Sequence, residues 1–316
     1  MAARYKDSPT VSATLELQTK ASVAAGSASD ATWAGPLAVH GIAGEALALE
    51  RGSSILGQLA GKFRRVPFRT NVPRETGSGS GGSWITEGGS VPVTSTAYDL
   101  VQQQSYRAGI ITVMTRELLN IGHSDSERTV RETVTAGVGA FLDGQFLNPA
   151  VTLIANQRPA SITNGATAIT STGSTGAQMS ADLGAMLAAI TTAGGGLTWI
   201  MRPTTAYRIA ATIGGTAAVD VPRSLFGVPL ILSKNSPAQI TLVDANHVLY
   251  SDDGGIDISS SDQATLQMND APTDPAVAAT VFESLWSKNL WAVRVTRWLA
   301  YLRAQSGAVS YMTVSY

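Results

Sequence analysis

One alternating segment constrains the fold of this sequence more than any other feature. Residues 290–303 place five apolar side chains on one face, namely Trp291, Val293, Val295, Leu299 and Tyr301. Strict alternation is typical of a β-strand with one buried face. A strand of this length needs a large sheet and a layer that covers its apolar face, so the sequence predicts a sheet packed against a helix.

A long helix is predicted at residues 124–148. Ser124 and Glu127 have the spacing of a capping box, and Asn148-Pro149 ends the helical pattern. About 24 residues at 1.5 Å each give a rod of roughly 36 Å. Its apolar stripe comprises Val130, Val134, Val138, Phe141 and Leu142. We expect this helix to cover the long strand.

Shorter elements account for most of the remaining chain. A strand at residues 63–72 is expected at a sheet edge, because it contains Pro67 and is followed by Pro73. Residues 150–180 are rich in Thr, Ser and Gly and are interpreted as a loop, and Asp252–Gly255 as a hairpin turn. Further strands are expected at 109–114, 198–201, 228–232, 239–242, 247–250 and 255–260, and further helices at 115–120, 181–192 and 203–213.

Residues 73–107 are predicted to form a long two-stranded hairpin that projects from the body. The segment is polar, contains Pro92, and includes the sequence TGSGSGG at residues 76–82, which is typical of a flexible tip. Because a lone hairpin is marginally stable in water, we expect it to rest on a neighbouring molecule. Residues 1–60 have few aromatic residues and two weak helical patterns, and residues 22–36 within them are predicted to form an extended arm.

The composition argues for a chain that is covered by partners. Charged residues make up 14% of the 316 residues, against about 25% in an average domain. Partner subunits would cover such a surface, although a merely neutral surface rich in small residues is the alternative. The net charge of −1 offers no positive field for sequence-independent binding to nucleic acid. The sequence has no cysteine, so disulfides are excluded. It also has no secretory signal and no long apolar stretch, so the chain is expected to work in solution inside a cell, away from membranes.

No motif predicts a catalytic, cofactor or metal site. None of the three histidines, His40, His123 and His247, has a second ligand at metal-binding spacing, and the glycine runs lack the order of a phosphate-binding loop. No G-x-S-x-G nucleophile motif occurs. Asp252, Asp253 and Asp257 are interpreted as a solvated turn in preference to a cation site, and Glu117 and Glu127 as carboxylates at helix starts.

Several stretches, in order, resemble the major capsid proteins of tailed phages, which have the Hong Kong 97 phage fold. Together they cover about residues 60–303. They are Arg65-Val66-Pro67-Phe68, Ser83-Trp84-Ile85-Thr86-Glu87-Gly88-Gly89, Ile110 to Leu119, Phe141 to Asn148, Phe226-Gly227-Val228-Pro229-Leu230, Asp252 to Ile256 and Leu290 to Arg297.

The resemblance implies an α+β fold with a defined division of the chain. Residues 1–60 would be the N-terminal arm, and residues 61–108 a strand plus the extended loop 73–107. Residues 109–149 and 276–303 would form a peripheral domain, in which the spine helix 124–148 lies on a β-sheet. An α/β axial domain would occupy residues 150–275, and residues 304–316 would be a C-terminal tail.

The implied function is that of a shell subunit in the virion, assembled in the cytoplasm of a bacterial host and without enzyme activity or cofactor. Pentamers and hexamers of the chain would close into an icosahedral shell around double-stranded DNA, which is not bound sequence-specifically. Expected partners are other copies, the portal protein, a scaffold, a maturation protease and decoration proteins. Candidate contacts between subunits are Trp84, Glu87, Tyr98, Arg107, Arg64, Arg65 and Arg74. Arginine suits such contacts because it pairs bidentately with carboxylates.

The sequence departs from the family pattern in two respects and leaves two alternative functions open. The predicted hairpin has no lysine, so the covalent cross-link that some members form is not expected. Many members also have a cleaved N-terminal scaffolding region; with only a short arm, this chain is expected either to dispense with that region or to rely on a separate scaffold. An encapsulin shell of the same fold is the nearest alternative, but the N-terminal residues resemble an open arm more than a cargo-binding helix. A monomeric hydrolase or sugar-binding protein is the alternative from another class.

Overall fold

The computed structural model describes residues 54–75, 83–91, 93, 97–121, 123–192, 194–214 and 223–314. Most of the predicted arm, the glycine-rich segment 76–82 and the side chains of the predicted capping box therefore lie outside the described residues. The chain forms two compact units. The described residues of the first unit are 109–121, 123–135 and 257–295, and those of the second are 54–75, 83–91, 93, 97–108, 136–192, 194–214, 223–256 and 296–314.

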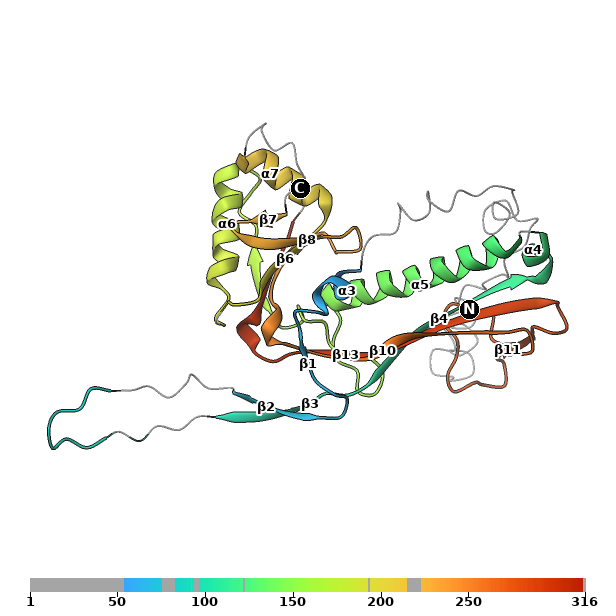
Figure 1. Ribbon diagram of the computed structural model, residues 1–316, viewed down its shortest axis with the longest axis horizontal. Helices are drawn as coiled ribbons and strands as arrows, with labels where there is room; N and C mark the ends of the chain where they lie inside the picture. The colour runs from blue at the N-terminus through green and yellow to red at the C-terminus, as the bar shows by residue number, and fades with distance from the viewer. Residues whose placement is uncertain are drawn as a thin grey trace, which may run out of the picture. The chain divides into compact units, whose positions relative to one another are not determined.

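The second unit contains a six-stranded mixed sheet with the order β5-β14-β9-β6-β8-β7 (Figure 1). Its strands are β5 (Thr167–Thr170), β6 (Leu197–Met201), β7 (Ser224–Leu225), β8 (Val228–Leu232), β9 (Gln239–Asp244) and β14 (Val309–Thr313). All six residues of β9 are buried, as expected for a central strand. The helices α6 (Gly176–Ala188) and α7 (Pro203–Gly214) belong to the same unit. Thr175 begins α6 with a capping box that includes Gln178.

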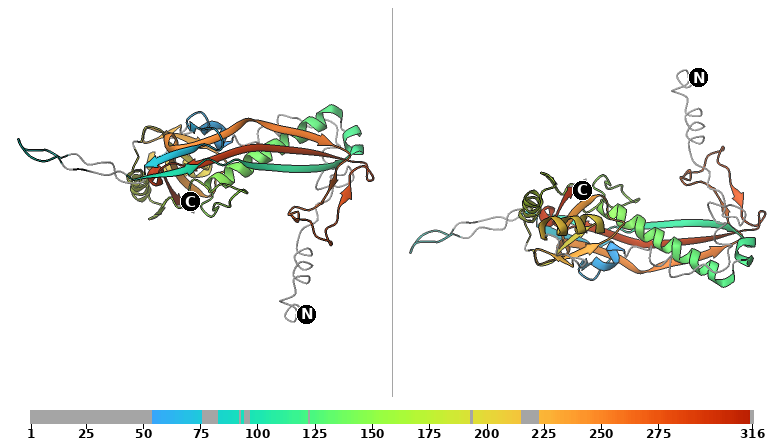
Figure 2. Two further views of the ribbon diagram at one scale, coloured as in Figure 1. Left: turned by 90° about the horizontal axis from the view of Figure 1, so that it is seen from below. Right: turned by 90° about the horizontal axis from the view of Figure 1, so that it is seen from above.

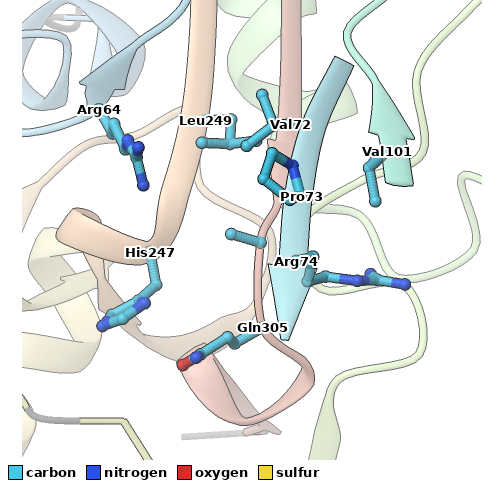
Figure 3. Close-up of a pocket in the computed structure, with 9 residues that line it drawn as sticks. Arg64, Val72, Pro73, Arg74, Val101, His247, Leu249 and Gln305 are labelled. Carbon is cyan, nitrogen blue, oxygen red and sulfur yellow. The ribbon is translucent and has the colours of Figure 1, made fainter. Parts of the chain in front are cut away.

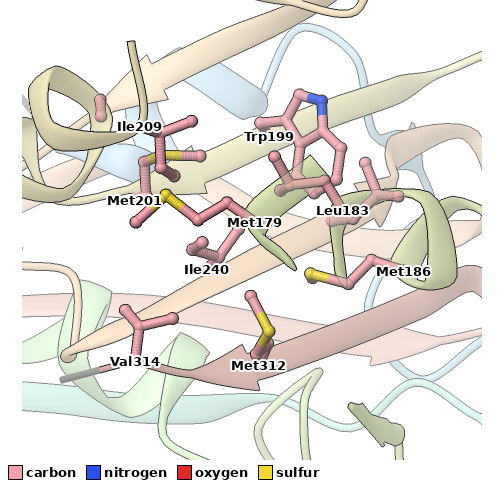
Figure 4. Close-up of a cluster of buried hydrophobic side chains, with 11 residues drawn as sticks. Met179, Leu183, Met186, Trp199, Met201, Ile209, Ile240, Met312 and Val314 are labelled. Atoms are coloured by element: carbon pink, nitrogen blue, oxygen red, sulfur yellow. The ribbon is translucent and has the colours of Figure 1, made fainter. Parts of the chain in front are cut away.

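The hydrophobic core of this sheet is rich in methionine (Figure 4). Met179 and Met186 of α6 face Trp199 of β6 and Met312 of β14, and all four side chains are fully buried. The indole Nε1–H of Trp199 donates to the carbonyl oxygen of Leu225 at 3.1 Å. Unbranched methionine side chains fill the irregular space around the large indole ring.

A four-stranded sheet has the order β1-β10-β13-β4, and Figure 2 shows its three long strands side by side. The strands are β1 (Arg64–Arg65), β4 (Tyr106–Thr115), β10 (Val248–Ser261) and β13 (Leu290–Arg303). The predicted strand 290–303 is confirmed, with Val293, Val295, Leu299 and Tyr301 buried. Trp291 is only partly buried.

The long helix predicted at residues 124–148 is confirmed as α5 (His123–Leu147). Val130, Val134, Val138 and Leu142 are buried, but Phe141 is 57% exposed, so its predicted place in the stripe is wrong. It lies at the margin of the stripe that the residues spaced by four define. At the end of the helix, Phe146 packs edge-on against Tyr301 of β13, with ring centroids 5.0 Å apart.

Two further α-helices are short, and a small hydrophobic core lies in the first unit. The short helices are α3 (Ile55–Leu59) and α4 (Arg116–Ile121). In the first unit, β11 (Thr265–Leu266) pairs with β12 (Glu283–Ser284), and Leu285, Leu290 and Ala292 are buried together. Arg116 pairs with Asp262 in the same unit.

Several local predictions are wrong because tertiary pairing overrides local preference. The hairpin turn predicted at Asp252–Gly255 is absent, since β10 continues through it as one strand. The strand predicted at 63–72 is broken into β1 and the first two residues of a second strand that begins at Asn71, because the chain turns at Arg69, whose φ is +58°. The segment 150–180 contains β5 and the start of α6, and the tail 304–316 contains β14.

Candidate subunit interface

A two-stranded ribbon is formed by β2 (Asn71–Glu75) and β3 (Tyr98–Gln102) (Figure 1). The strands pair antiparallel from Asn71 opposite Gln102 to Glu75 opposite Tyr98, which confirms that the two arms of the predicted hairpin meet. Across the ribbon, Arg74 donates from Nη2 to Asp99 Oδ2 at 2.7 Å. Tyr98 and Leu100 are each 70% exposed, and large apolar side chains gathered on an exposed surface often mark a binding site.

Backbone hydrogen bonds close the root of this ribbon, which lies at residues 69–71 and 102–104. The N–H of Arg69 donates to the carbonyl oxygen of Gln103 at 2.6 Å, and the N–H of Gln103 donates to that of Thr70 at 3.0 Å. Gln103 is almost completely buried. The two strands therefore leave from a closed pair of chain segments, and the loop between them has a defined starting point.

A β-turn forms within the loop that joins β2 to β3. The N–H of Gly89 donates to the carbonyl oxygen of Thr86 at 2.9 Å, and Gly88 has a φ of +78°. This φ at the third position of a turn suits glycine, which has no Cβ to clash. The turn places Glu87 at a corner, with Trp84 fully exposed just before it.

A pocket of about 160 Å³ lies beside the root of the ribbon (Figure 3). Its apolar wall includes Val72, Pro73 and Leu249. Figure 3 shows Arg64 and His247 on one side of the pocket, Gln305 below them, and the guanidinium of Arg74 turned away. The lining residues are Arg64, Val72, Pro73, Arg74, Val101, His247, Leu249, Ala304 and Gln305.

The surroundings of this pocket are basic. Residues 62–74 contain five cationic side chains and no carboxylate. Next to the pocket residue Ala304, the guanidinium of Arg303 donates to the carbonyl oxygens of Ile162, Asn164 and Gly165, at 3.1, 3.2 and 3.0 Å. Burial, together with the positive charge of Arg74, lowers the pKa of Arg303. Because Arg74 pairs with Asp99 and is turned away from the pocket, Arg64 is the pocket residue that offers a cation to an anionic group.

The structure brings some of the predicted contact residues together and separates others. Arg64 and Arg74 line the same pocket, and Trp84 and Glu87 belong to the same turn region. Tyr98 lies on the ribbon.

Arg65 and Arg107 have partners within their own unit. Arg65 is opposite Tyr250 in the β1–β10 pairing, and its charge partly offsets the rise in the pKa of Tyr250 that burial causes. Arg107 lies 5.7 Å from the ring centroid of Trp298 and makes a cation–π contact with it. Both arginines therefore have local structural roles as well.

Sequence reasoning missed most of the exposed apolar residues. It selected Trp84 and Tyr98 but overlooked Leu100 in the ribbon and Val91 and Val93 in the loop. The available signal was the presence of large apolar residues within a polar, glycine-rich stretch. A second exposed group, in the first unit, comprises Val277, Val281, Phe282 and Trp286.

Asp252, which was interpreted as part of a solvated turn, instead has partners on two strands. Asp252 Oδ2 accepts from Arg297 Nη2 at 2.6 Å and from the hydroxyl of Tyr250 at 2.7 Å. Burial, followed by the hydrogen bond to Asp252, raises the pKa of Tyr250 well above its usual value. Asp252 is therefore part of an ion pair that joins β10 to β13.

Comparison with known proteins identifies the family. The model of the Phage capsid family matches residues 52–279, which is more than half of the chain. This chain belongs to the Phage capsid family. Among curated proteins, this family member is similar to the "Capsid polyprotein" of Pseudomonas phage PAJU2, with 34% identity over 323 residues. The match covers 96% of this chain and 48% of the relative, so the chain spans about half the length of the curated relative that it matches.

Solved structures have the same fold as this Phage capsid family member. A chain from Mycobacterium phage Bobi is 16% identical with a TM-score of 0.65, covering 93% of this chain and 100% of that one. A chain from Mycobacterium phage Adephagia is 16% identical with a TM-score of 0.64, covering 88% and 95%. The capsid of a native GTA particle is 12% identical with a TM-score of 0.59, covering 93% and 100%. These likenesses confirm a mixed α+β fold of the Hong Kong 97 type.

Within the described ranges, none of the helices combines the length and the apolar character needed to cross a bilayer.

Proposed function

We propose that this chain is the major capsid protein of a tailed phage or prophage and that it acts by self-assembly, without catalysis. The observation that carries the proposal is the ribbon with its loop, where Trp84, Tyr98 and Leu100 present large apolar side chains to solvent. An isolated ribbon of this kind is marginally stable, and burial against another copy would remove its apolar surface from water. Membership of a capsid family supports the same function.

Assembly would follow from contacts between unlike surfaces of identical subunits. When such head-to-tail contacts repeat by rotation they close into rings, here pentamers and hexamers of an icosahedral shell. The net charge of −1 suits a container that encloses double-stranded DNA without binding it tightly. The ribbon and the N-terminal arm 1–60 would adjust to the differences between ring sizes.

The proposed domain assignment follows the domain organisation of the family. Residues 109–149 and 276–303 would form the peripheral domain with its spine helix, and residues 150–275 the axial domain at the ring centres. The long helix α5 and the six-stranded sheet are the elements that support this assignment. The loop 73–107 would lie across an adjacent subunit, and residues 304–316 would be the tail.

The expected surroundings are those of a virion protein assembled in a bacterial cytoplasm. The portal protein, a scaffold, a maturation protease and decoration proteins are proposed partners. A covalent cross-link between subunits through a loop lysine is not proposed, because residues 76–97 contain no lysine.

The test is the assembly state of the purified chain. Sizing chromatography and electron microscopy, over a range of protein concentrations and with a co-expressed scaffold where the genome supplies one, should reveal rings and closed shells. Elution as a 33 kDa monomer at every concentration and in both conditions would contradict the proposal.

A further inference from the structure

We propose that the turn at residues 86–89 of one copy docks into the basic pocket beside the ribbon root of the next copy, where Arg64 binds the Glu87 carboxylate. This inference rests on the proposed function, because it names a contact between shell subunits. The partner is a second copy of this chain, and the contact is directional, from the turn of one subunit to the root of another.

The donors around the pocket are available. Within the part of the chain that the structure describes, the guanidinium of Arg64 and the side-chain amide of Gln305 have no hydrogen-bond partner. His247 Nε2 lies 3.8 Å from Asp244 Oδ2, a separation too long for a hydrogen bond. A carboxylate at this place would accept two hydrogen bonds from the fork of Arg64 and one from Gln305.

The ribbon and its loop have opposite charge at their two ends. The chain leading into the ribbon is basic, with five cations in residues 62–74. Glu87 is the sole charged residue in the sequence from residue 76 to residue 97. Copies that contact each other from loop to root therefore place unlike charges together, whereas a root-to-root contact would place like charges together.

The shape of the turn also suits the pocket. Its backbone hydrogen bond and the glycine conformation at Gly88 preform the corner that carries Glu87, which lowers the entropy cost of docking. The fully exposed Trp84 and the half-exposed Ile85 would cover Val72 and Pro73 of the pocket wall. An acidic group with apolar neighbours thus meets a basic pocket with an apolar wall.

The chain's own pocket does not hold this carboxylate. Glu87 is exposed and pairs with none of the described residues. Thirteen Cα–Cα steps join Arg74 to Glu87 in the sequence, and a chain of that length spans at most roughly 45 Å. This reach is sufficient for contact with a neighbouring copy.

A cross-linking test is direct because the chain has no cysteine. An Arg–Glu pair holds its two backbones too far apart for a disulfide, so the double variant Arg64→Cys/Glu87→Cys is treated, in assembled particles, with a short bis-maleimide cross-linker. The cross-linker should give a ladder of covalent multimers on a denaturing gel. The matched control pairs Glu87→Cys with Arg208→Cys, an exposed arginine on α7, and should give no ladder. Asp270 and Asp274 are exposed carboxylates in the first unit. A ladder from Arg64→Cys with Asp270→Cys or Asp274→Cys, but not with Glu87→Cys, would overturn the assignment of the occupant.

A charge exchange provides an independent test. Glu87→Arg and Arg64→Glu should each lower the assembled fraction about tenfold, and the variant that combines them should recover it. Thermal unfolding of each variant verifies that the subunit still folds. A wild-type chain that stays monomeric overturns the proposed function, whereas shells that form equally well with both single variants overturn the docking contact alone.

Discussion

The carboxylate of Asp143 on α5 accepts a hydrogen bond from the backbone N–H of Ile55, the first residue of α3, at 2.9 Å. The same fully buried carboxylate accepts from the N–H of Leu56 and the hydroxyl of Ser54, each at 3.1 Å, and from the amide of Asn235 at 3.4 Å. Asp143 therefore satisfies donors at the start of α3 that have no partner within the helix. It fixes the place where residues 55–59 join the body of the second unit.

Replacement of this carboxylate should destabilise the second unit. Asp143→Ala leaves several buried donors without an acceptor and should lower the free energy of unfolding by about 3 kcal/mol. Asp143→Asn keeps one acceptor oxygen and nearly the same shape, so it should lose less. Urea titrations monitored by tryptophan fluorescence measure both changes. Equal losses for the two variants would contradict this account of the side chain.

The pH dependence of stability should reveal the same group. Burial raises the pKa of Asp143, although its four hydrogen bonds lower it. Because the folded pKa lies above the unfolded value of about 3.9, the folded state binds more protons between these two values. The stability contribution of this group is therefore greatest below the unfolded pKa and is lost as the pH rises through the folded pKa.

The matched reference for this effect is the non-titrating Asp143→Asn variant. The free energy of unfolding of the wild type minus that of the variant should be larger near pH 3 than at pH 7. Unfolding curves for both proteins across this range give the difference directly. A difference that is constant with pH, or that grows with rising pH, would show that the folded pKa is not raised.

Replacement of Trp199 by alanine should destabilise the fold far more than replacement of Trp84. Trp199→Ala removes a fully buried indole and leaves the Leu225 carbonyl without its 3.1 Å donor, so it should cost about 3–5 kcal/mol. Trp84→Ala, at a fully exposed position, should change the free energy of unfolding by less than about 0.5 kcal/mol. Calorimetry of both variants tests the contrast, and a comparable loss for Trp84→Ala would mean that this residue is buried in the isolated subunit.

Arg303 should not tolerate lysine well. Its guanidinium donates to three carbonyl oxygens of the segment 162–165, and a lysine ammonium does not have the fork geometry needed to reach all three. Arg303→Ala should cost about 2 kcal/mol, and Arg303→Lys should recover only part of this loss. Arg208→Ala on the surface of α7 is the control. Full recovery by lysine would show that charge alone matters at this position.

Shortening the loop should separate folding from assembly. Because Glu75 is opposite Tyr98, replacing residues 76–97 with Asn-Gly converts the ribbon into a tight hairpin. We expect an unchanged melting temperature and no shells by electron microscopy. A Gly/Ser loop of the original length keeps the reach but removes Trp84 and Glu87, and it should also fail to assemble. Normal shells from either variant would contradict the role of the loop in subunit contacts.

Periodic segments were the part of the fold that sequence reasoning predicted best. Residues 290–303 and 123–147 carry regular apolar patterns over many residues, and both elements are present. Local signals failed where pairing with distant residues decides the structure. The sequence Asp252–Gly255 favours a turn, yet it lies within β10, which continues through it next to β13 in the four-stranded sheet.

The candidate interface was predicted in part for a similar reason. Trp84 and Glu87 are conspicuous in a polar, glycine-rich loop, and the ribbon follows from the two flanking strands. The pocket was not predictable, because it combines residues around positions 64, 73, 101, 247 and 305. Only the folded chain brings these segments together, and no local pattern marks His247 or Gln305.

The position of β14 determines when a newly synthesised chain can fold. Residues 309–313 form the strand that pairs with β5 on one side and β9 on the other, so the six-stranded sheet has a missing central strand until they leave the ribosome. The side chains of Val309 and Met312 are fully buried in the finished sheet. Until these two residues are in place, the other strands leave part of the core open to water. A nascent polypeptide that is still being translated thus lacks a finished sheet.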